Sequence, residues 1–350
     1  MKSPPSLWKS PAYPNWVLQA PSNPPTMAYV VISLSFLLLA SIVLLCLWNG
    51  VYLPSHSLSF GGGHARCKGP HGQNVDQIRN GIYDTSPFNR DKLSPPFFRY
   101  RAEYQVAPAY NLSFCRIEKV MTTIFDAIMC YINNPVEFEV HNRRISTELY
   151  QTRFCADRNL FLDLEGVYEA IGPRRTELVV VRHPIDRFLS GFADKCLREA
   201  LRQPERCYAC NGDMDCFLTA LVKDMDDVFN KNAYEYSYEL HHFAPQTWYC
   251  DFTSHLDKYT IVKYESGPHG ALNMANQFDF VFRRAGVPSK IRREIRKELL
   301  VDRNKHATFG TEQRRRAEHM LMSNLTLLTR VTQIFYYDFI VFDYQLPVLI

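Results

Sequence analysis

The stretch ELVVVRHPIDRFLSGFADKC, residues 177–196, decides the fold class that this sequence predicts. Its apolar, β-branched run at 178–181 is typical of a strand buried in a parallel sheet, and Pro184 suits the first turn of a helix. Such a strand carries Arg182 to its carboxyl end, where open α/β sheets bind ligands and helix N-termini attract anions. Ser190 follows about two helical turns later, so its hydroxyl and the Arg182 guanidinium can converge on one phosphate or sulfate group.

A plainer interpretation of the same stretch also exists. Arg182 and Arg187 could pair with surface carboxylates, and Ser190 could be a solvated helix residue, because short motifs often occur by chance. The assignment to an anion site therefore depends on a second segment of matching design.

That second segment is NLSFCRIEKVMTTIFDAIMCYIN, residues 111–133. Its pattern predicts a strand at 112–115, a tight connection at 116–121 and an amphipathic helix at 122–131. The chain thus repeats the order strand, cationic loop and helix.

The second segment also supplies groups that bind anions. Thr122 and Thr123 stand where the helix begins, so their hydroxyls can cap the backbone or bind a phosphate group, and Lys119 adds a positive charge. The chain contains no GxxxxGK[ST] motif, which argues against an ordinary nucleoside triphosphatase.

Together the two segments resemble the Golgi carbohydrate sulfotransferases, the family of the chondroitin, dermatan and HNK-1 enzymes. In that family a P-K-x-x-x-T loop binds the 5′-phosphosulfate of PAPS (3′-phosphoadenylyl sulfate), and V-R-x-P-x-x-R-x-x-S-x-[FY] binds its 3′-phosphate. The second motif is complete here, from Val181 to Phe192. The first runs from Glu118 to Thr123, with Glu118 in place of the proline. A carboxylate at that position would repel a polyanion unless its side chain points away.

Later stretches extend the resemblance over about 110–347, in the order that the family shows. They look like its H-W-x-P segment with a following Cys, its Y-D-x-[IV]-G-K-[YF]-E segment and its closing Y-x-x-D-F-x-x-F-x-Y, and they lie at 239–250, 257–265 and 337–344. Phe243 replaces the family's Trp, and Val262 its Gly. The resemblance implies a P-loop-like sulfotransferase fold.

The resemblance implies transfer of a sulfuryl group from PAPS to a hydroxyl of a glycan acceptor, itself polyanionic, without a metal ion. Lys119, Thr122 and Thr123 would then bind the leaving phosphate side of PAPS, and Arg182 and Ser190 its 3′-phosphate.

The reaction also needs a general base for the attacking hydroxyl, and histidine suits that role near neutral pH. We expect His242, because it lies in the stretch that resembles the family's H-W segment. The other candidates are His141, His183, His241, Asp163 and Glu165.

Two other functions are compatible with the sequence. A noncatalytic lumenal protein derived from a sulfotransferase would account for Glu118 and the missing Trp. A type II Golgi glycosyltransferase would share the layout of the chain, but its usual metal-binding D-x-D motif is matched only at 213–215, inside a cysteine-rich insertion.

The N-terminal part predicts a membrane anchor. Residues 1–27 form a Pro- and Ser-rich cytoplasmic tail, and 28–48 are uncharged and long enough to span a bilayer. Two lysines precede this span, so the positive-inside rule places the tail in the cytosol. A stem at 49–101 and a lumenal domain at 102–350 would follow. A long cleaved signal peptide is the alternative.

Composition and element order fit one large three-layer α/β domain built on a parallel sheet. The pattern predicts a further strand at 259–263 and helices at 217–230, 273–285, 290–300 and 312–335. Residues 142–169 look mostly helical. The net charge of +4 does not indicate nucleic-acid binding, and a homo-oligomer stays open.

Ten cysteines fit an oxidising compartment. Four of them cluster, and a disulfide-stapled insertion explains them more simply than zinc does: Cys196, Cys207, Cys210 and Cys216. Two glycosylation sequons begin at Asn111 and Asn324.

Overall fold

The computed structural model describes residues 70–231, 237–301 and 310–349. These residues belong to one compact unit, Lys68–Ile350. The predicted tail, the predicted span at 28–48 and the first part of the predicted stem lie outside the described residues. Across the described ranges, no helix is both long and apolar enough to cross a membrane.

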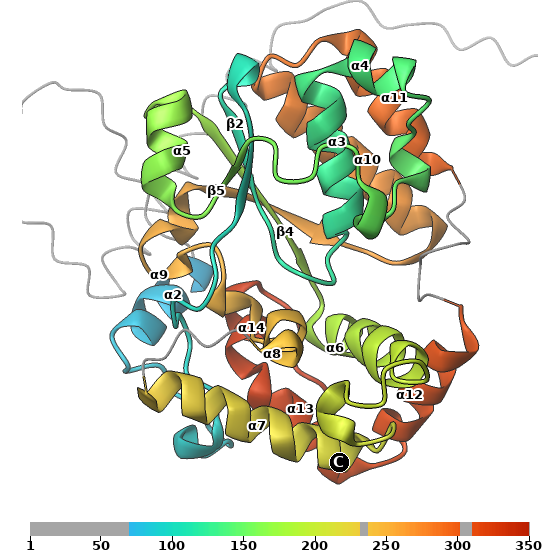
Figure 1. The fold of residues 1–350 in the computed structure, drawn as a ribbon. Helices are drawn as coiled ribbons and strands as arrows, with labels where there is room; N and C mark the ends of the chain where they lie inside the picture. Colours follow the sequence, from blue (N-terminus) through green and yellow to red (C-terminus); the bar gives the residue numbers. More distant parts are fainter. Residues whose placement is uncertain (1–69, 232–236, 302–309, 350) are drawn as a thin grey trace, which may run out of the picture. The chain divides into compact units, whose positions relative to one another are not determined.

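One five-stranded sheet forms the centre of the domain (Figure 1), with the strand order β3-β1-β2-β4-β5. The strands are β1 (Tyr104–Ala107), β2 (Leu112–Cys115), β3 (Leu160–Phe161), β4 (Thr176–Arg182) and β5 (Tyr259–Tyr264). β2, β4 and β5 are parallel, whereas β1 pairs antiparallel with both β2 and β3. The α/β class is confirmed, but the expected parallel sheet is a mixed sheet.

The antiparallel pair follows from the length of its connection. Only residues 108–111 separate β1 from β2, and Asn111 completes the turn in the left-handed region at φ 45°. A parallel pair needs a crossover of a dozen residues or more, so this short link permits only a hairpin.

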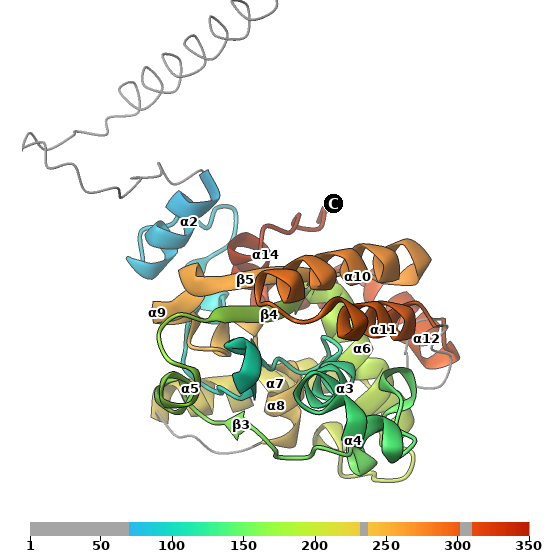
Figure 2. The same cartoon turned by 90° about the horizontal axis from the view of Figure 1, so that it is seen from above.

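Two groups of helices surround the sheet. α10 packs against β4 and β5, α3 packs against β1, and α11 contacts both helices (Figure 2). In contrast, α6, α7, α8 and α12 to α14 lie beyond the carboxyl end of β4 (Figure 1). The helices are α2 (Pro70–Arg79), α3 (Thr122–Asn133), α4 (Pro135–Val140), α5 (Leu164–Ile171), α6 (Pro184–Asp194), α7 (Met214–Lys231), α8 (Tyr238–Phe243), α9 (Phe252–His255), α10 (Gly267–Arg284), α11 (Ser289–Leu300), α12 (Glu312–Met322), α13 (Leu325–Ile334) and α14 (Tyr336–Val341).

Several predicted helix bounds were wrong. α10 begins six residues earlier than expected. The helix predicted at 312–335 is two helices, because the Asn324 side chain accepts the N–H groups of Thr326 and Leu327 and starts α13 anew. Residues 142–169, expected to be mostly helical, contain short 3-10 turns, the edge strand β3 and the start of α5.

The globular domain begins before the predicted boundary at residue 102. α2 buries Val75 and Ile78, which lie three residues apart on one helix face. Arg79 pairs with Asp257 at 3.1 Å, and the ring of Phe98 lies 4.9 Å from that of Trp248. More than half of the predicted stem, residues 70–101, is therefore part of the domain.

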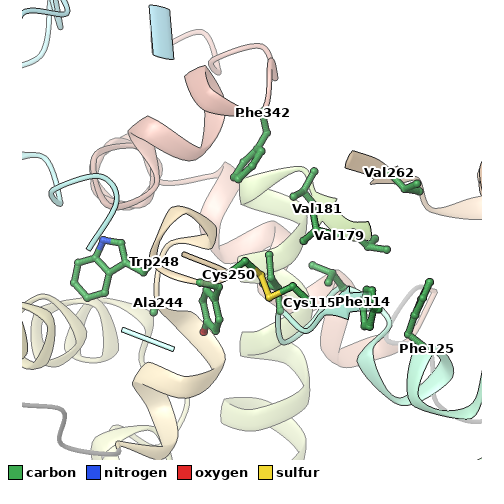
Figure 3. Close-up of a cluster of buried hydrophobic side chains, with 14 of the residues drawn as sticks. Phe114, Cys115, Phe125, Val179, Val181, Ala244, Trp248, Cys250, Val262 and Phe342 are labelled. Carbon is green, nitrogen blue, oxygen red and sulfur yellow. A yellow bond between two sulfur atoms is a disulfide. The ribbon is translucent and has the colours of Figure 1, made fainter. Parts of the chain in front are cut away.

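The buried core reaches the base of the loop that follows β2 (Figure 3). Phe114 in β2 stacks on Phe125 of α3, with 3.8 Å between the ring centroids. A disulfide joins Cys115, the last residue of β2, to Cys250. Both contacts hold the ends of the loop at 116–121.

The cysteine-rich insertion is closed by disulfides, as predicted. Cys196 pairs with Cys207, and Cys210 pairs with Cys216. Together with the pairs Cys115–Cys250 and Cys130–Cys155, they make four disulfides among the described residues.

Candidate functional site

The two predicted anion-binding segments meet at the carboxyl edge of the sheet. β2 and β4 are adjacent parallel strands, with Cys115 beside Val179. The chain leaves β2 into the loop that carries Lys119 and leaves β4 at Arg182. Parallel neighbours end at the same edge of a sheet, so pairing alone brings the two cations together.

The loop at 116–121 has an unusual backbone. Lys119 and Met121 adopt positive φ angles of 66° and 76°, which non-glycine residues rarely do. The Thr122 hydroxyl donates a 2.7 Å hydrogen bond to the carbonyl oxygen of Ile117 and closes the loop. Backbone strain of this kind persists only where the surrounding structure enforces it, and such positions cluster at functional sites.

α3 begins directly after this loop and presents its N-terminus there. Its N-cap residue is Met121, which makes no side-chain cap hydrogen bond. The N–H groups of the first turn are therefore left for another acceptor, and the helix dipole favours an anion there. Thr123, in this first turn, is half-buried.

Arg182 is the centre of the contact between the two segments. Its guanidinium donates to the carbonyl oxygen of Lys119 at 3.1 Å and to the Asp186 carboxylate at 2.5 Å. The side chain of Gln246 bonds both the N–H and the carbonyl of Arg182, each at 2.8 Å. Asp186 also pairs with Arg314 at 2.6 Å. These contacts fix Arg182 from three sides.

One face of α6 presents polar groups to both cations. Asp186, Ser190 and Asp194 are spaced four residues apart and therefore share a helix face. Asp186 pairs with Arg182, and Asp194 accepts a hydrogen bond from the Lys119 ammonium at 2.6 Å. Ser190 lies between these two carboxylates on the helix face. It is therefore on the same side of α6 as Lys119 and Arg182.

The electrostatics of Lys119 reflect this crowding. Burial, together with the charges of Lys195 and Arg182, holds the pKa of Lys119 below its ordinary value, although the Asp194 carboxylate acts in the opposite direction. The charges of Lys119, Lys195 and Arg198 lower the pKa of Asp194 against the effect of its burial. The cations are thus concentrated where the two segments meet.

The side chain of Glu118 points toward His241 of α8. Its carboxylate bonds Nε2 of His241, and both side chains are about nine-tenths buried. Burial alone would raise the pKa of Glu118, but the hydrogen bond and charge of His241 and the charge of Arg116 lower it to about 2. The repulsion expected from a carboxylate at this position is therefore relieved within the protein.

Arg187 has an internal role and is not a surface ion-pair residue. Its guanidinium donates to the carbonyl oxygens of Glu118 at 2.9 Å and Ala244 at 2.7 Å, and more weakly to that of His242. It therefore ties the Lys119 loop to the segment that contains His242.

His242 has the features of a neutral base. Its Nδ1 donates to the carbonyl oxygen of Tyr238 at 2.7 Å, which leaves Nε2 as the basic nitrogen. Burial, with the nearby charges of Lys195 and Lys119, lowers the pKa of His242 to about 3. The Tyr238 ring, whose centroid is 4.5 Å from that of His242, also lies 5.4 Å from the Lys195 ammonium.

The other candidate bases are engaged elsewhere. His241 bonds Glu118, and His183 lies between the rings of Phe339 and Tyr344, 5.4 Å from each. Asp163 caps the N-terminus of α5, and Glu165 lies in the first turn of that helix. α5 contacts β1 and β3, on the side of the sheet away from β4 and β5. His141 bonds the carbonyl oxygen of Glu137 at the end of α4.

Four residues of this site were not identified from the sequence. Asp186 and Asp194 could have been found, because each lies a multiple of four residues from Arg182 in a strand-to-helix stretch. Tyr238 and Gln246 carry no such signal, since their roles depend on where α8 and the segment after it pack.

A cavity of about 620 Å³ lies away from this edge, at the far end of α3. Its cations are paired with its own carboxylates: Arg144 bonds Glu298 at 2.8 Å, and Lys297 bonds Glu294 at 3.0 Å. It offers no excess positive charge, so we do not place the anion site there.

The residues of the D-x-D match have structural partners. Asp213 accepts the N–H of Cys216 at 2.9 Å, and Asp215 pairs with Arg330. No cluster of His, Cys, Asp and Glu suited to a metal ion occurs in the part of the chain that the structure describes.

Comparison with known proteins identifies the class. A model of the sulfotransferase family matches residues 102–345, so this chain belongs to the sulfotransferase family. It is 32% identical over 274 residues to carbohydrate sulfotransferase chst-1 of Caenorhabditis elegans, covering 75% of this chain and 82% of that protein. Within the family, it is a member of the carbohydrate sulfotransferases.

Two further relatives come from the same organism. The chain is 31% identical over 265 residues to the uncharacterized protein C18B2.2, covering 74% of each chain. It is 31% identical over 228 residues to the putative sulfotransferase vep-2, covering 63% of this chain and 70% of that protein. No solved structure matches the chain.

Proposed function

We propose that this protein transfers a sulfuryl group from PAPS to a hydroxyl of a glycan. The observation that carries the proposal is the hydrogen bond from Arg182 to the carbonyl oxygen of Lys119. It joins the two segments that resemble the phosphosulfate and 3′-phosphate motifs of the family. We expect the cations of the two segments to bind one nucleotide from two sides.

The residues present fit the chemistry of PAPS. Its two anionic ends need cations and N–H donors, and this edge offers Lys119, the N-terminus of α3, Arg182 and the Ser190 hydroxyl. PAPS supplies the sulfuryl group: a bond forms between the acceptor oxygen and sulfur while the bond from sulfur to the 5′-phosphate breaks, and 3′,5′-ADP leaves with the electron pair.

Each residue has a defined task in this proposal. Lys119 neutralises charge on the leaving phosphate side, with the Thr123 hydroxyl and the first-turn N–H groups of α3, that of Thr122 included, because the Thr122 hydroxyl already donates to Ile117. Arg182 and Ser190 bind the 3′-phosphate. His242 takes the proton of the attacking hydroxyl at Nε2, since its Nδ1 proton is held by Tyr238.

We further propose that the acceptor is a polyanionic glycan, such as a chondroitin-like glycosaminoglycan, and that the domain works in the Golgi lumen behind a type II anchor at 28–48. Four disulfides support an oxidising compartment. The excess of lysine and arginine over acidic residues is compatible with an anionic acceptor.

The experiment is sulfate transfer from [35S]PAPS to a panel of desulfated glycosaminoglycans and neutral glycans. We expect incorporation into at least one glycan, and its loss in Lys119→Met. Incorporation into none of them, in protein that binds 3′,5′-ADP by calorimetry, would favour the rival function of a noncatalytic nucleotide-binding protein. A Golgi glycosyltransferase would instead consume a nucleotide sugar and leave [35S]PAPS intact.

A further inference from the structure

Three cations share a single carboxylate next to the proposed donor site. Asp194 Oδ2 is 2.6 Å from the Lys119 ammonium and 3.4 Å from that of Lys195. Its other oxygen, Oδ1, bonds the Arg198 guanidinium. Lys195 and Arg198 follow α6 in one π-helical turn, Lys195–Glu199, and therefore project from the same end of that helix.

The two oxygens of Asp194 face different surroundings. The Lys119 and Lys195 side chains are mostly buried, at 14% and 18% exposure, whereas the Arg198 side chain is 51% exposed. One oxygen thus faces the interior of the site, and the other faces solvent. Arg198 can keep its bond to Asp194 while the inner oxygen is exchanged.

The inner side of this cluster also adjoins the proposed base. The Lys195 ammonium lies 5.4 Å from the centroid of the Tyr238 ring, which in turn packs 4.5 Å from the ring of His242. Lys195 bonds Glu199 at 2.8 Å, and the Tyr238 hydroxyl donates to Glu199 at 2.6 Å. Lys195 therefore lies between Asp194 and the Tyr238 ring, which packs against His242.

We propose that Asp194 is an internal counter-ion that competes with the sulfuryl donor, and that Lys195 is a second cation of the transfer site. This inference rests on the proposed function. When the 5′-phosphate side of the nucleotide reaches Lys119 and Lys195, the inner oxygen of Asp194 gives up both lysines and the carboxylate stays on Arg198.

Charge accounts for both halves of the proposal. Without Asp194, the buried Lys119 ammonium would lose its 2.6 Å carboxylate partner, and Glu199 would be left to balance Lys195, so Asp194 stabilises the ligand-free enzyme. An incoming phosphate group carries more negative charge and more acceptor oxygens than one carboxylate oxygen, and it can satisfy both lysines together. Lys195 then stabilises the charge that develops on the leaving group, beside Lys119.

The experiment measures 3′,5′-ADP binding by calorimetry and transfer kinetics with PAPS. Asp194→Asn removes the competing charge and keeps the shape, so we expect roughly tenfold tighter binding of 3′,5′-ADP. Asp227→Asn, an exposed change on α7, is the matched control. Unchanged or weaker binding by folded Asp194→Asn would overturn the counter-ion role.

The variant Arg198→Met tests the counter-ion role by removing the solvent-exposed partner of Asp194. Without Arg198, the carboxylate stays with the two lysines, and we expect 3′,5′-ADP to bind several-fold more weakly. In the Asp194→Asn background the same change should have no effect, which a double-mutant cycle detects. The single variant Arg198→Met keeps the inference testable if Asp194→Asn fails to fold, because an unchanged affinity in Arg198→Met contradicts it.

Lys195→Met should lower kcat with PAPS by roughly a hundredfold and weaken 3′,5′-ADP binding less, whereas Lys195→Arg should recover part of the loss. Lys223→Met, an exposed lysine on α7, is the control. Equal rates for Lys195→Met and wild type would remove Lys195 from the transfer site.

Failure of the proposed function has a different signature. If the wild type binds no 3′,5′-ADP, the proposed donor is wrong. The counter-ion role is then tested with inorganic sulfate as the ligand. If the two lysines form an anion site, Asp194→Asn should bind sulfate more tightly than the wild type. Equal sulfate affinities of the two proteins would contradict the counter-ion role.

Discussion

The guanidinium of Arg182 donates a 3.1 Å hydrogen bond to the carbonyl oxygen of Lys119, although 63 residues separate them along the chain. Arg182 is the last residue of β4, and Lys119 lies in the loop after β2. Because these strands are parallel neighbours, the link is a direct result of sheet topology. The side chain of Arg182, in the proposed 3′-phosphate motif, therefore helps to position the Lys119 loop, which is the proposed phosphosulfate motif.

The first prediction concerns this link. Arg182→Lys keeps the charge but loses the planar fork that reaches both Lys119 and Asp186, so we expect 3′,5′-ADP to bind about tenfold more weakly. Calorimetry measures the affinity, with Arg293→Lys on the exposed face of α11 as the control. Equal affinities of both variants would show that Arg182 does not contact the nucleotide.

The second prediction concerns His242. His242→Gln keeps a polar side chain but no base, so we expect transfer to fall by roughly a thousandfold while 3′,5′-ADP binding stays within about twofold. His269→Gln, exposed on α10, should behave as wild type. Near-normal turnover in His242→Gln would exclude this residue as the base.

The third prediction is the pH profile of the wild type. A base must be neutral to accept a proton, and the pKa of His242 is lowered to about 3. Its neutral form therefore prevails well below pH 6, and we expect no acid limb from an ordinary histidine near pH 6.5 in kcat/KM. A limb centred between pH 6 and 7 would point to another base or to a more solvated His242.

The fourth prediction concerns the stability that Glu118 provides. Its pKa is about 2, lower than the ordinary 4.5, so its carboxylate stabilises the fold above about pH 4.5 and loses that effect as the pH falls toward 2. Glu118→Gln breaks a buried pair with His241, and we expect a loss of roughly 3 kcal/mol in the free energy of unfolding at pH 7. The loss should shrink at pH 3 in urea titrations. A loss of equal size at both pH values would show that charge is not the cause.

The fifth prediction compares two disulfides. The bond Cys115–Cys250 closes 135 residues of chain, whereas Cys210–Cys216 closes six. Chain-entropy reasoning predicts a cost of about 5 kcal/mol for the double serine variant of the first pair and about 2 kcal/mol for the second. Denaturant unfolding measures both. Similar costs would mean that local packing, and not loop closure, decides the effect.

The sequence by itself determined the local elements and the motif pair. The β-branched run before Arg182, the Thr pair after Lys119 and the apolar periodicity of the helix between them are short-range signals, and they predicted β2, β4, α3 and the start of α6 correctly. The complete second motif and the order of the later stretches also identified the family, which the family model over 102–345 confirms.

Only the tertiary structure decided which charged side chains pair with one another. The pairing of β1 with β3, the pairing of Lys119 with Asp194 and the burial of Glu118 against His241 join residues from distant parts of the chain. A pattern along one strand or helix reports which side of it is apolar, but not which distant side chain will lie opposite. That choice is made when the elements pack and each buried charge must find a partner, so it appears only in the folded chain.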